Sequence, residues 1–260
     1  MTRLEIPKIN RQILTRDDGA TIAYCIDSGG TLPGVLFLGG FRSDLEGTKA
    51  SALADHCRKC DQPYVRFDYF GHGASSGDFR AGTIGRWLED SLSVFDRLTE
   101  GPQILVGSSM GCWIALLAAL ARPARVAGLV GIAGAVDFTE DLIWDCLNEE
   151  QRRRLLTEGE LTHHSAYEDG PVPFTRGLIE EGREHLLLRN PIALACPVRL
   201  LHGMADPDIP YATTLRLARR LAGTEVVVEL IEDGDHRLSR EADLARLAAA
   251  IDELSLRARS

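Results

Sequence analysis

Residues 103–121 read QILVGSSMGCWIALLAALA, in which an apolar run passes through a glycine-serine turn into an alanine- and leucine-rich helical run. Gly-x-Ser-x-Gly between a strand and a helix indicates a sharp turn that lifts a serine hydroxyl above a sheet. Side chains two residues before and after that serine would collide with the turn, so both positions favour glycine. Gly107 and Gly111 stand at these positions around Ser109. The same positions around Ser108 are valine and methionine, so Ser109 is the predicted nucleophile.

A second match to this pattern, GASSG at residues 73–77, is centred on Ser75. It follows the loop FGHG and precedes GDFRAG, a sequence unsuited to a helix. Because the motif needs a strand before the serine and a helix after it, we exclude Ser75. For Ser109 the alternative interpretation is a small residue in a tight turn with no chemical role.

The rest of the chain alternates between short apolar runs and helical patterns. Two runs flank Asp18-Gly19, which is a hairpin turn signal. Strands are predicted at 11–17, 21–27, 34–39, 63–69, 103–107, 126–134, 198–203 and 225–232, and helices at 47–60, 83–98, 109–121, 211–223 and 241–254. This alternation predicts an α/β fold, with a mostly parallel central sheet flanked by helices and the opening hairpin as its antiparallel edge.

One segment, 139–190, interrupts this alternation because it contains no strand-like run. We interpret it as short helices, at 142–156 and 173–188, separated by a polar loop. An insertion between two sheet strands is a natural place for a lid over an active site. We therefore predict a core made of 1–138 and 191–260 with a helical lid inserted at 139–190; the alternative is an ordinary helical crossover with a long loop.

An activated serine needs a base, and the base needs an acid that orients it. In this architecture the chain order is serine, acid, histidine. Of the seven histidines, His236 lies after the last apolar run and before the final helix, where the base is expected, whereas His202 ends a strand and is expected to support the next loop. Asp206 follows that strand and is the predicted acid. The alternatives are Asp208, which we expect to cap the next helix, and Asp137.

An oxyanion intermediate also needs hydrogen-bond donors. The backbone N–H of Met110 would be one, since it starts a helix. The N–H of Phe41 would be the other, because the preceding Gly39-Gly40 lets the backbone approach closely. We further predict substrate contacts for Gly40, Trp113 and Trp144, although both tryptophans are equally well explained as core or lid packing. Arg42 and Lys49 could meet an anionic substrate group, but solvation at the surface is the favoured interpretation.

Composition limits the partners and the location. The net charge of −9 argues against nucleic acid, and no apolar run is long enough to span a bilayer. The first twelve residues lack the apolar core of a secretory signal, so we expect a cytoplasmic protein. The six cysteines are scattered, which suits reduced thiols. We interpret the single CxxC, Cys57 and Cys60, as helix composition rather than as a metal or redox site.

Several stretches together resemble the α/β-hydrolase superfamily of serine esterases and thioesterases, and within it a branch of mitochondrial acyl-protein thioesterases that also cleave acyl glucuronides. They are GTKA (47–50), RFDYFGHGASSG (66–77), GPQILVGSSMGCW (101–113), CPVRLLHGMADPDIP (196–210) and DGDHRL (233–238). The resemblance implies the same trio, Ser109, Asp206 and His236. It is weakest in the lid, which leaves the acyl substrate open. We expect no mitochondrial leader, as in a bacterial-type cytoplasmic relative.

These observations predict a serine hydrolase that cleaves carboxylic esters or acyl thioesters through an acyl-enzyme. No metal or organic cofactor is expected for this reaction, and the partner is a small-molecule or acyl-protein substrate. Two alternatives stay open: a non-hydrolytic receptor for a small ligand on the same fold, and a hydrolase of peptide or carbon–carbon bonds.

Overall fold

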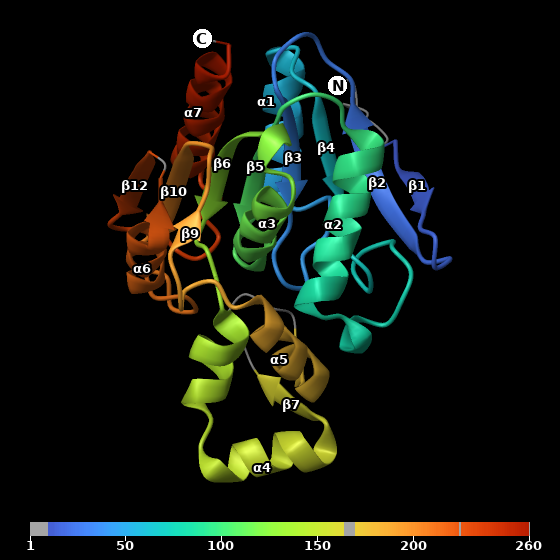
Figure 1. Cartoon of the computed structure of the whole chain (residues 1–260), viewed down its shortest axis with the longest axis vertical. Coiled ribbons are helices and arrows are strands. Elements are labelled where there is room, and N and C mark those ends of the chain that lie inside the picture. The colour runs from blue at the N-terminus through green and yellow to red at the C-terminus, as the bar shows by residue number, and fades with distance from the viewer. Residues whose placement is uncertain (1–9, 164–169, 224, 260) are drawn as a thin grey trace, which may run out of the picture.

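The computed structural model describes residues 10–163, 170–223 and 225–259. Within these residues the core is an eight-stranded sheet in the order β1-β2-β4-β3-β5-β6-β10-β12 (Figure 1). Its strands are β1 (Gln12–Thr15), β2 (Thr21–Asp27), β3 (Gly34–Leu38), β4 (Tyr64–Phe67), β5 (Gln103–Ser108), β6 (Val126–Ile132), β10 (Val198–Gly203) and β12 (Val226–Ile231). All pairs from β4 to β12 are parallel, whereas β1–β2 and β2–β4 are antiparallel. The predicted α/β class and antiparallel edge are confirmed.

The antiparallel edge follows from the turn between its first two strands. Gly19 has a φ of 83°, which glycine adopts at little cost. The Asp18 carboxylate accepts a hydrogen bond of 3.0 Å from the N–H of Ala20. This local bonding reverses the chain and sets Thr15 opposite Thr21.

Helices cover both faces of the sheet, as the alternation predicts. They are α1 (Thr48–Lys59), α2 (Ile84–Leu98), α3 (Met110–Ala121), α6 (Ala212–Arg220) and α7 (Glu241–Arg257). Residues of α1 and α7 form one apolar core with the sheet, and residues of α2, α3 and α6 form the other. The most buried helix is α3, whose apolar side chains reach nearly all round it and lie against the sheet and its neighbours. It directly follows β5, so the turn at Ser109 is anchored on both sides by core.

The inserted segment, residues 139–190, extends from the core beyond the ends of β5 and β6 (Figure 1). It contains a π-helical turn (Thr139–Ile143), a 3-10 turn (Trp144–Cys146), α4 (Glu149–Glu158), α5 (Arg176–Gly182) and a second 3-10 turn (Arg183–His185). The expectation of no strand here is wrong, because β7 (Glu160–His163) pairs antiparallel with β8 (Val172–Thr175). Both strands are four residues long, and β8 contains a proline, so neither gives the alternating apolar pattern of a strand.

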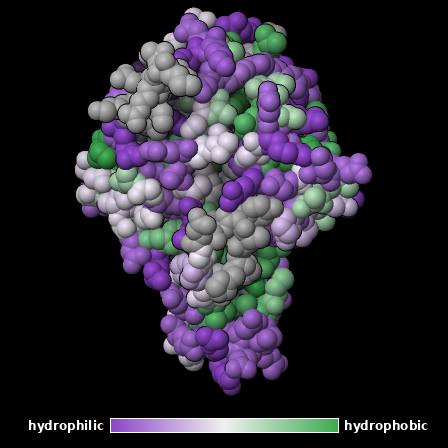
Figure 2. Space-filling view, turned by 180° about the vertical axis from the view of Figure 1, so that it is seen from behind, coloured by the Kyte–Doolittle hydropathy of each residue, from purple (hydrophilic) through white to green (hydrophobic). Residues whose placement is uncertain are grey.

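Helix α4 forms the tip of this segment. Asn148 caps it by accepting a hydrogen bond from the N–H of Gln151, and Gly159 ends it with a φ of 86°. Leu155 is buried, while most other side chains of α4 are exposed. The tip is accordingly hydrophilic over much of its surface, as the lower end of Figure 2 shows.

Strands β9 (Ile192–Ala193) and β11 (Leu221–Ala222) form a short parallel pair beside the sheet. No helix in the described ranges combines the length and apolar character that a bilayer crossing requires. All six cysteines are free thiols; Cys60 and Cys146 are exposed and the other four are buried.

Candidate active site

Ser109 occupies a strained turn between β5 and α3. Its φ of 53° and ψ of −119° are unusual for a residue with a side chain. A Cβ on Gly107 would lie 2.3 Å from the carbonyl oxygen of Gly111, and a Cβ on Gly111 would lie 2.1 Å from that of Leu38. These are contacts with rigid backbone, so the glycines are required on steric grounds. The N–H of Ser109 donates to Ile132 at 2.8 Å, which fixes the turn against β6.

Replacing Gly111 with alanine should therefore destabilise the protein. The new methyl group cannot be accommodated without moving β3, at a cost of about 1–3 kcal/mol or more in the free energy of unfolding. Urea denaturation measures this cost. The matched control is Gly177→Ala in α5, where a Cβ meets nothing within 4 Å; it should leave stability unchanged or raise it. Equal stabilities of the two variants would contradict the steric account of the turn.

Asp206 and His236 are brought together from the loops that follow β10 and β12. Nδ1 of His236 lies 2.7 Å from Oδ2 of Asp206. The other carboxylate oxygen, Oδ1, accepts hydrogen bonds of 2.9 Å from the N–H groups of Asp208 and Ile209. The Asp206 side chain is completely buried, and that of His236 is 17% exposed. The Asp206 carboxylate is thus fixed by backbone hydrogen bonds, whereas the His236 ring is partly exposed and lines the pocket.

His202, near the end of β10, contacts the Asp206 carboxylate and the loop that follows the strand, as its position in the sequence predicts. Its Nε2 lies 3.3 Å from Oδ2 of Asp206 and 2.9 Å from the Ile209 carbonyl, and its Nδ1 lies 2.6 Å from Thr214 Oγ1. Burial alone would raise the pKa of Asp206, but hydrogen bonds from His202, His236 and the Ile209 N–H outweigh it. The net effect is a pKa well below the ordinary value, so Asp206 is ionised at neutral pH.

The other candidate acids have different partners. Asp137 is buried after β6 and accepts hydrogen bonds of 2.8 Å from the N–H groups of Leu187 and Leu188, which ties down the end of the inserted segment. Asp208 lines the pocket, but it does not cap the next helix, because α6 begins at Ala212 after Tyr211. The expected capping role of Asp208 is therefore wrong.

The loop after β3 presents the Phe41 N–H in a defined direction. The Gly40 carbonyl accepts hydrogen bonds from the Ser43 N–H at 3.1 Å and the Ser43 hydroxyl at 2.8 Å. In a trans peptide the N–H of the next residue points the opposite way, so the Phe41 N–H is directed away from Ser43. A Cβ on Gly40 would lie only 3.4 Å from Ser109 Cβ, so this peptide lies beside the serine.

His72 fixes the other end of that loop, a contact that sequence reasoning did not predict. Its Nε2 accepts a hydrogen bond of 3.1 Å from the N–H of Arg42, whose φ is 58°. Its Nδ1 lies 3.1 Å from the Phe70 carbonyl. Burial lowers the pKa of His72 to about 4, so the ring stays neutral and keeps one nitrogen as an acceptor.

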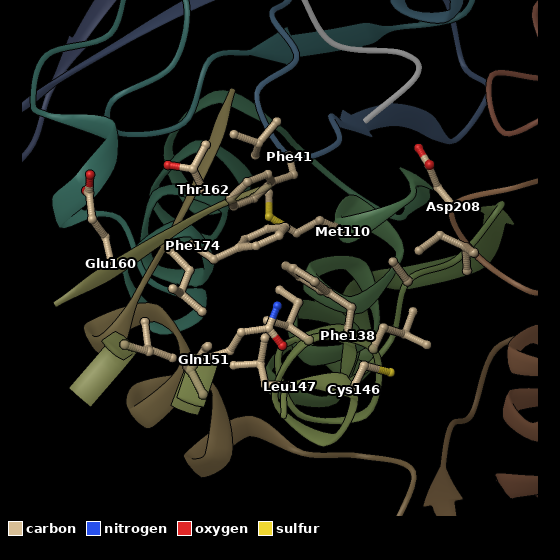
Figure 3. A pocket seen from close by; sticks show the side chains of 18 of the residues that line it. Phe41, Met110, Phe138, Cys146, Leu147, Gln151, Glu160, Thr162, Phe174 and Asp208 are labelled. Atoms are coloured by element: carbon tan, nitrogen blue, oxygen red, sulfur yellow. The ribbon is translucent and has the colours of Figure 1, made fainter. Parts of the chain in front are cut away.

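A cavity of about 1170 Å³ joins Ser109 and His236 to the inserted segment. Figure 3 shows Phe41, Phe138 and Phe174 gathered around Met110. The Phe41 ring lies 5.8 Å from that of Phe138 and 5.7 Å from that of Phe174. Further apolar lining comes from Leu142, Ile143, Leu147, Leu155, Leu161, Val172, Ile179 and Ile209. The lining therefore combines aromatic and aliphatic side chains with polar groups, among them Gln151 and Glu160 of the inserted segment.

The structure places both tryptophans outside the lining of the cavity, so their substrate contacts stay predictions. Trp113 is fully buried, its indole N–H donates to His185 O at 3.0 Å, and its ring supports Phe138 edge-on rather than lining the cavity. The guanidinium groups of Arg152 and Arg183 lie over the Trp144 ring, 5.2 and 4.7 Å from its centroid, and Trp144 is outside the cavity lining. Gly40 contributes backbone beside Ser109 rather than lining surface.

The fold and the site together define the class of protein. A mostly parallel sheet with a strained serine turn after β5, a histidine in the loop after its last strand and an inserted segment is typical of an α/β hydrolase. The mitochondrial palmitoyl-protein thioesterase ABHD10 of Bos taurus is 41% identical over 248 residues, covering 95% of this chain and 80% of that protein. The chain belongs to the α/β-hydrolase family that contains the ABHD10 thioesterases.

Two solved structures agree with this assignment. Mouse ABHD10 has a TM-score of 0.88 and 40% identity, covering 94% of this chain and 97% of that chain. A crystal structure of a protein from Agrobacterium vitis S4 has a TM-score of 0.91 and 43% identity, covering 95% and 99%. Residues 35–163 also match the family described as serine aminopeptidase, S33. The α/β-hydrolase resemblance found in the sequence is confirmed.

Proposed function

We propose that the chain is a serine-dependent hydrolase of acyl thioesters and carboxylic esters. The observation that carries the proposal is the Asp206–His236 hydrogen bond of 2.7 Å at the edge of a cavity that Ser109 also lines. A nucleophile on a strained turn, a histidine and a buried, ionised carboxylate are the groups that acyl transfer through a covalent intermediate needs.

The first half of the reaction acylates the serine. Ser109 Oγ attacks the carbonyl carbon while His236 takes its proton at Nε2, since Nδ1 is held by Asp206. Asp206 fixes the ring tautomer and stabilises the imidazolium that forms. The N–H groups of Phe41 and Met110 bind the developing oxyanion. His236 then returns its proton to the departing thiolate or alkoxide.

The second half repeats these steps with water as the nucleophile. His236 removes a proton from the water, which attacks the acyl carbon. His236 then gives this proton to Ser109 Oγ as the C–O bond breaks and the acid is released. The chain's own residues supply every proton transfer, so the reaction runs without a metal or organic cofactor. Losing one oxyanion donor would cost about 3 kcal/mol of transition-state stabilisation.

The cavity supports an apolar acyl group as the substrate's recognised part. Its aromatic and aliphatic lining comes from both the core and the inserted segment, and apolar lining of this kind binds hydrocarbon by the hydrophobic effect. The relatives are named palmitoyl-protein thioesterases. We therefore propose that residues 139–190 act as a lid, with 1–138 and 191–260 as the core. Cytoplasmic location stays a prediction, since the same relatives are named mitochondrial.

Matched substrates test the bond that is cleaved. An acyl thioester, an oxygen ester and an amide of the same acyl length should be compared by kcat/KM, with product released over many turnovers. We expect the thioester and activated ester to be hydrolysed well and the amide poorly. Preferential cleavage of the amide, or release of a single equivalent of product, would contradict the proposed function.

Lys49 provides a test of how the histidine loop is positioned. Its Nζ donates to the carbonyl of Arg237, the residue after His236, rather than lining the cavity. Lys49→Met should lower kcat by about 10- to 100-fold through misplacement of His236, with little change in KM. Lys49→Arg should recover part of the loss. The control is Lys59→Met, also on α1; a loss equal in the two methionine variants, or confined to KM, would contradict this role.

A further inference from the structure

Three side chains of different chemistry meet where α1 and α7 lie side by side. His56 Nε2 lies 2.8 Å from Oδ1 of Asp252 and 3.8 Å from Sγ of Cys60. All three donor atoms lie within 4.8 Å of one another. None of these residues lines the cavity at Ser109. The cluster is therefore separate from the proposed active site, and nothing in the acyl-transfer mechanism uses it.

The geometry of α1 places two of the donors on one face. Cys60 is the C-terminal capping residue that follows α1, and its N–H donates to the His56 carbonyl at 3.1 Å, which continues the helical turn. Residues four apart in a helical turn are neighbours on its surface. Cys57 is different, because its side chain is completely buried in the core. The two cysteines of the CxxC pair therefore differ: the Cys57 thiol packs in the core, and the Cys60 thiol is accessible to solvent.

The core beneath the cluster holds the two helices in place. Ala54 and Cys57 of α1 belong to the same buried cluster as Ile251 and Leu254 of α7. Asp252 follows Ile251 directly, so its position relative to His56 is set by buried side chains rather than by a flexible loop. The His56 side chain is 21% exposed and that of Asp252 is 49% exposed, which leaves the donors reachable from solvent.

We propose that His56, Cys60 and Asp252 form a binding site for a divalent transition metal of the zinc class. Imidazole, thiolate and carboxylate together are donors that this borderline-soft ion accepts, with water as the fourth ligand. In a tetrahedral zinc site the sulfur and nitrogen would be about 3.5 Å apart, and the nitrogen and oxygen about 3.3 Å. The nitrogen–sulfur and nitrogen–oxygen separations of 3.8 and 2.8 Å are within a few tenths of an ångström of these values. The sulfur and the carboxylate oxygen, which lie within 4.8 Å of each other, would approach to about 3.5 Å by rotation of the exposed Cys60 and Asp252 side chains.

Metal binding requires that the donor atoms lose their protons, which are released to solvent. The ion replaces the proton shared by His56 and Asp252 and displaces the thiol proton of Cys60 to solvent, so that sulfur coordinates as thiolate. The metal then joins α1 to α7. Because α7 follows the loop that carries His236, and Lys49 of α1 bonds to the Arg237 carbonyl in that loop, the site links two helices that are both connected to the loop. Because the ion binds the folded chain, it stabilises that state by RT ln(1 + L/Kd), where L is the free metal concentration.

Cobalt(II) is the probe, because a thiolate ligand gives it a charge-transfer band and tetrahedral geometry gives it strong visible absorption. The full chain, reduced with a phosphine, should bind one cobalt ion and show both features, and zinc should displace them. Cys60→Ser should abolish the charge-transfer band, and His56→Ala and Asp252→Asn should each weaken binding at least about tenfold. Cys146→Ser, which removes the other exposed cysteine, should change nothing.

Thermal unfolding provides the second readout. Zinc should raise the unfolding temperature of the wild type and of Cys146→Ser, but not that of Cys60→Ser. Absence of the charge-transfer band in the wild type, its persistence in Cys60→Ser, or an equal rise in unfolding temperature in all three proteins would overturn the proposal. These measurements do not depend on turnover, so they stand whether or not the proposed hydrolase activity is found.

Discussion

Alanine at position 109 should reduce thioester turnover by roughly 10⁴- to 10⁶-fold while leaving the fold intact. The variant loses the only atom that forms the proposed acyl bond. The strained backbone of the turn is set by Gly107, Gly111 and the hydrogen bond to Ile132, none of which uses the serine hydroxyl. Steady-state kinetics on an acyl thioester measures the loss, and circular dichroism checks the fold.

The neighbouring serine is the matched control for this experiment. Ser108 is the last residue of β5 and is nearly buried. Ser108→Ala should keep kcat close to that of the wild type, since its side chain has no part in the proposed chemistry. Comparable losses in the two variants, or full activity of Ser109→Ala, would remove the basis for assigning the nucleophile.

Asparagine in place of Asp206 should lower kcat by about 10⁴-fold. The amide keeps the size of the side chain, and its oxygen can still accept from the N–H groups of Asp208 and Ile209. Its NH₂ group would then face His236 Nδ1 and donate to it, which forces the proton onto Nε2. In that tautomer His236 cannot accept the proton of Ser109. The loss should appear in kcat, with KM little changed.

Asp208→Asn separates this effect from a general change of charge in the loop. Asp208 is two residues away and lines the same cavity. Because Asp206 makes the 2.7 Å hydrogen bond to Nδ1 of His236, we expect Asp208→Asn to keep far more of the wild-type kcat than Asp206→Asn does. Loss of activity in Asp208→Asn, with Asp206→Asn remaining active, would reverse the assignment of the acid.

Features governed by local sterics could be predicted from the sequence. The α/β class, the antiparallel edge and the order of strands and helices follow from apolar periodicity and turn residues, and the structure confirms them. The choice of Ser109 over Ser108 used only the space available two residues away, and the positive φ at Ser109 agrees with it. The proximity of Asp206 and His236 was expected from chain order, whereas their catalytic roles stay predictions.

Features that depend on contacts between distant segments could not be predicted. The β7–β8 hairpin is stabilised by pairing rather than by its own residue pattern. Trp113 and Trp144 are equally suited by sequence to a pocket or to packing, and their contacts with His185 and with the two arginines carry no signal in the sequence. The bonds from Lys49 to Arg237 and from Arg42 to His72 join segments with no shared local signal.

A fluorophosphonate probe followed by peptide mass spectrometry tests the central claim most directly. The account predicts one covalent adduct per chain, on Ser109, formed rapidly in the wild type and far more slowly in His236→Ala, with labelling blocked by an acyl thioester substrate. An adduct on Ser108 or Ser75, or labelling of Ser109 that is indifferent to the loss of His236, would contradict it.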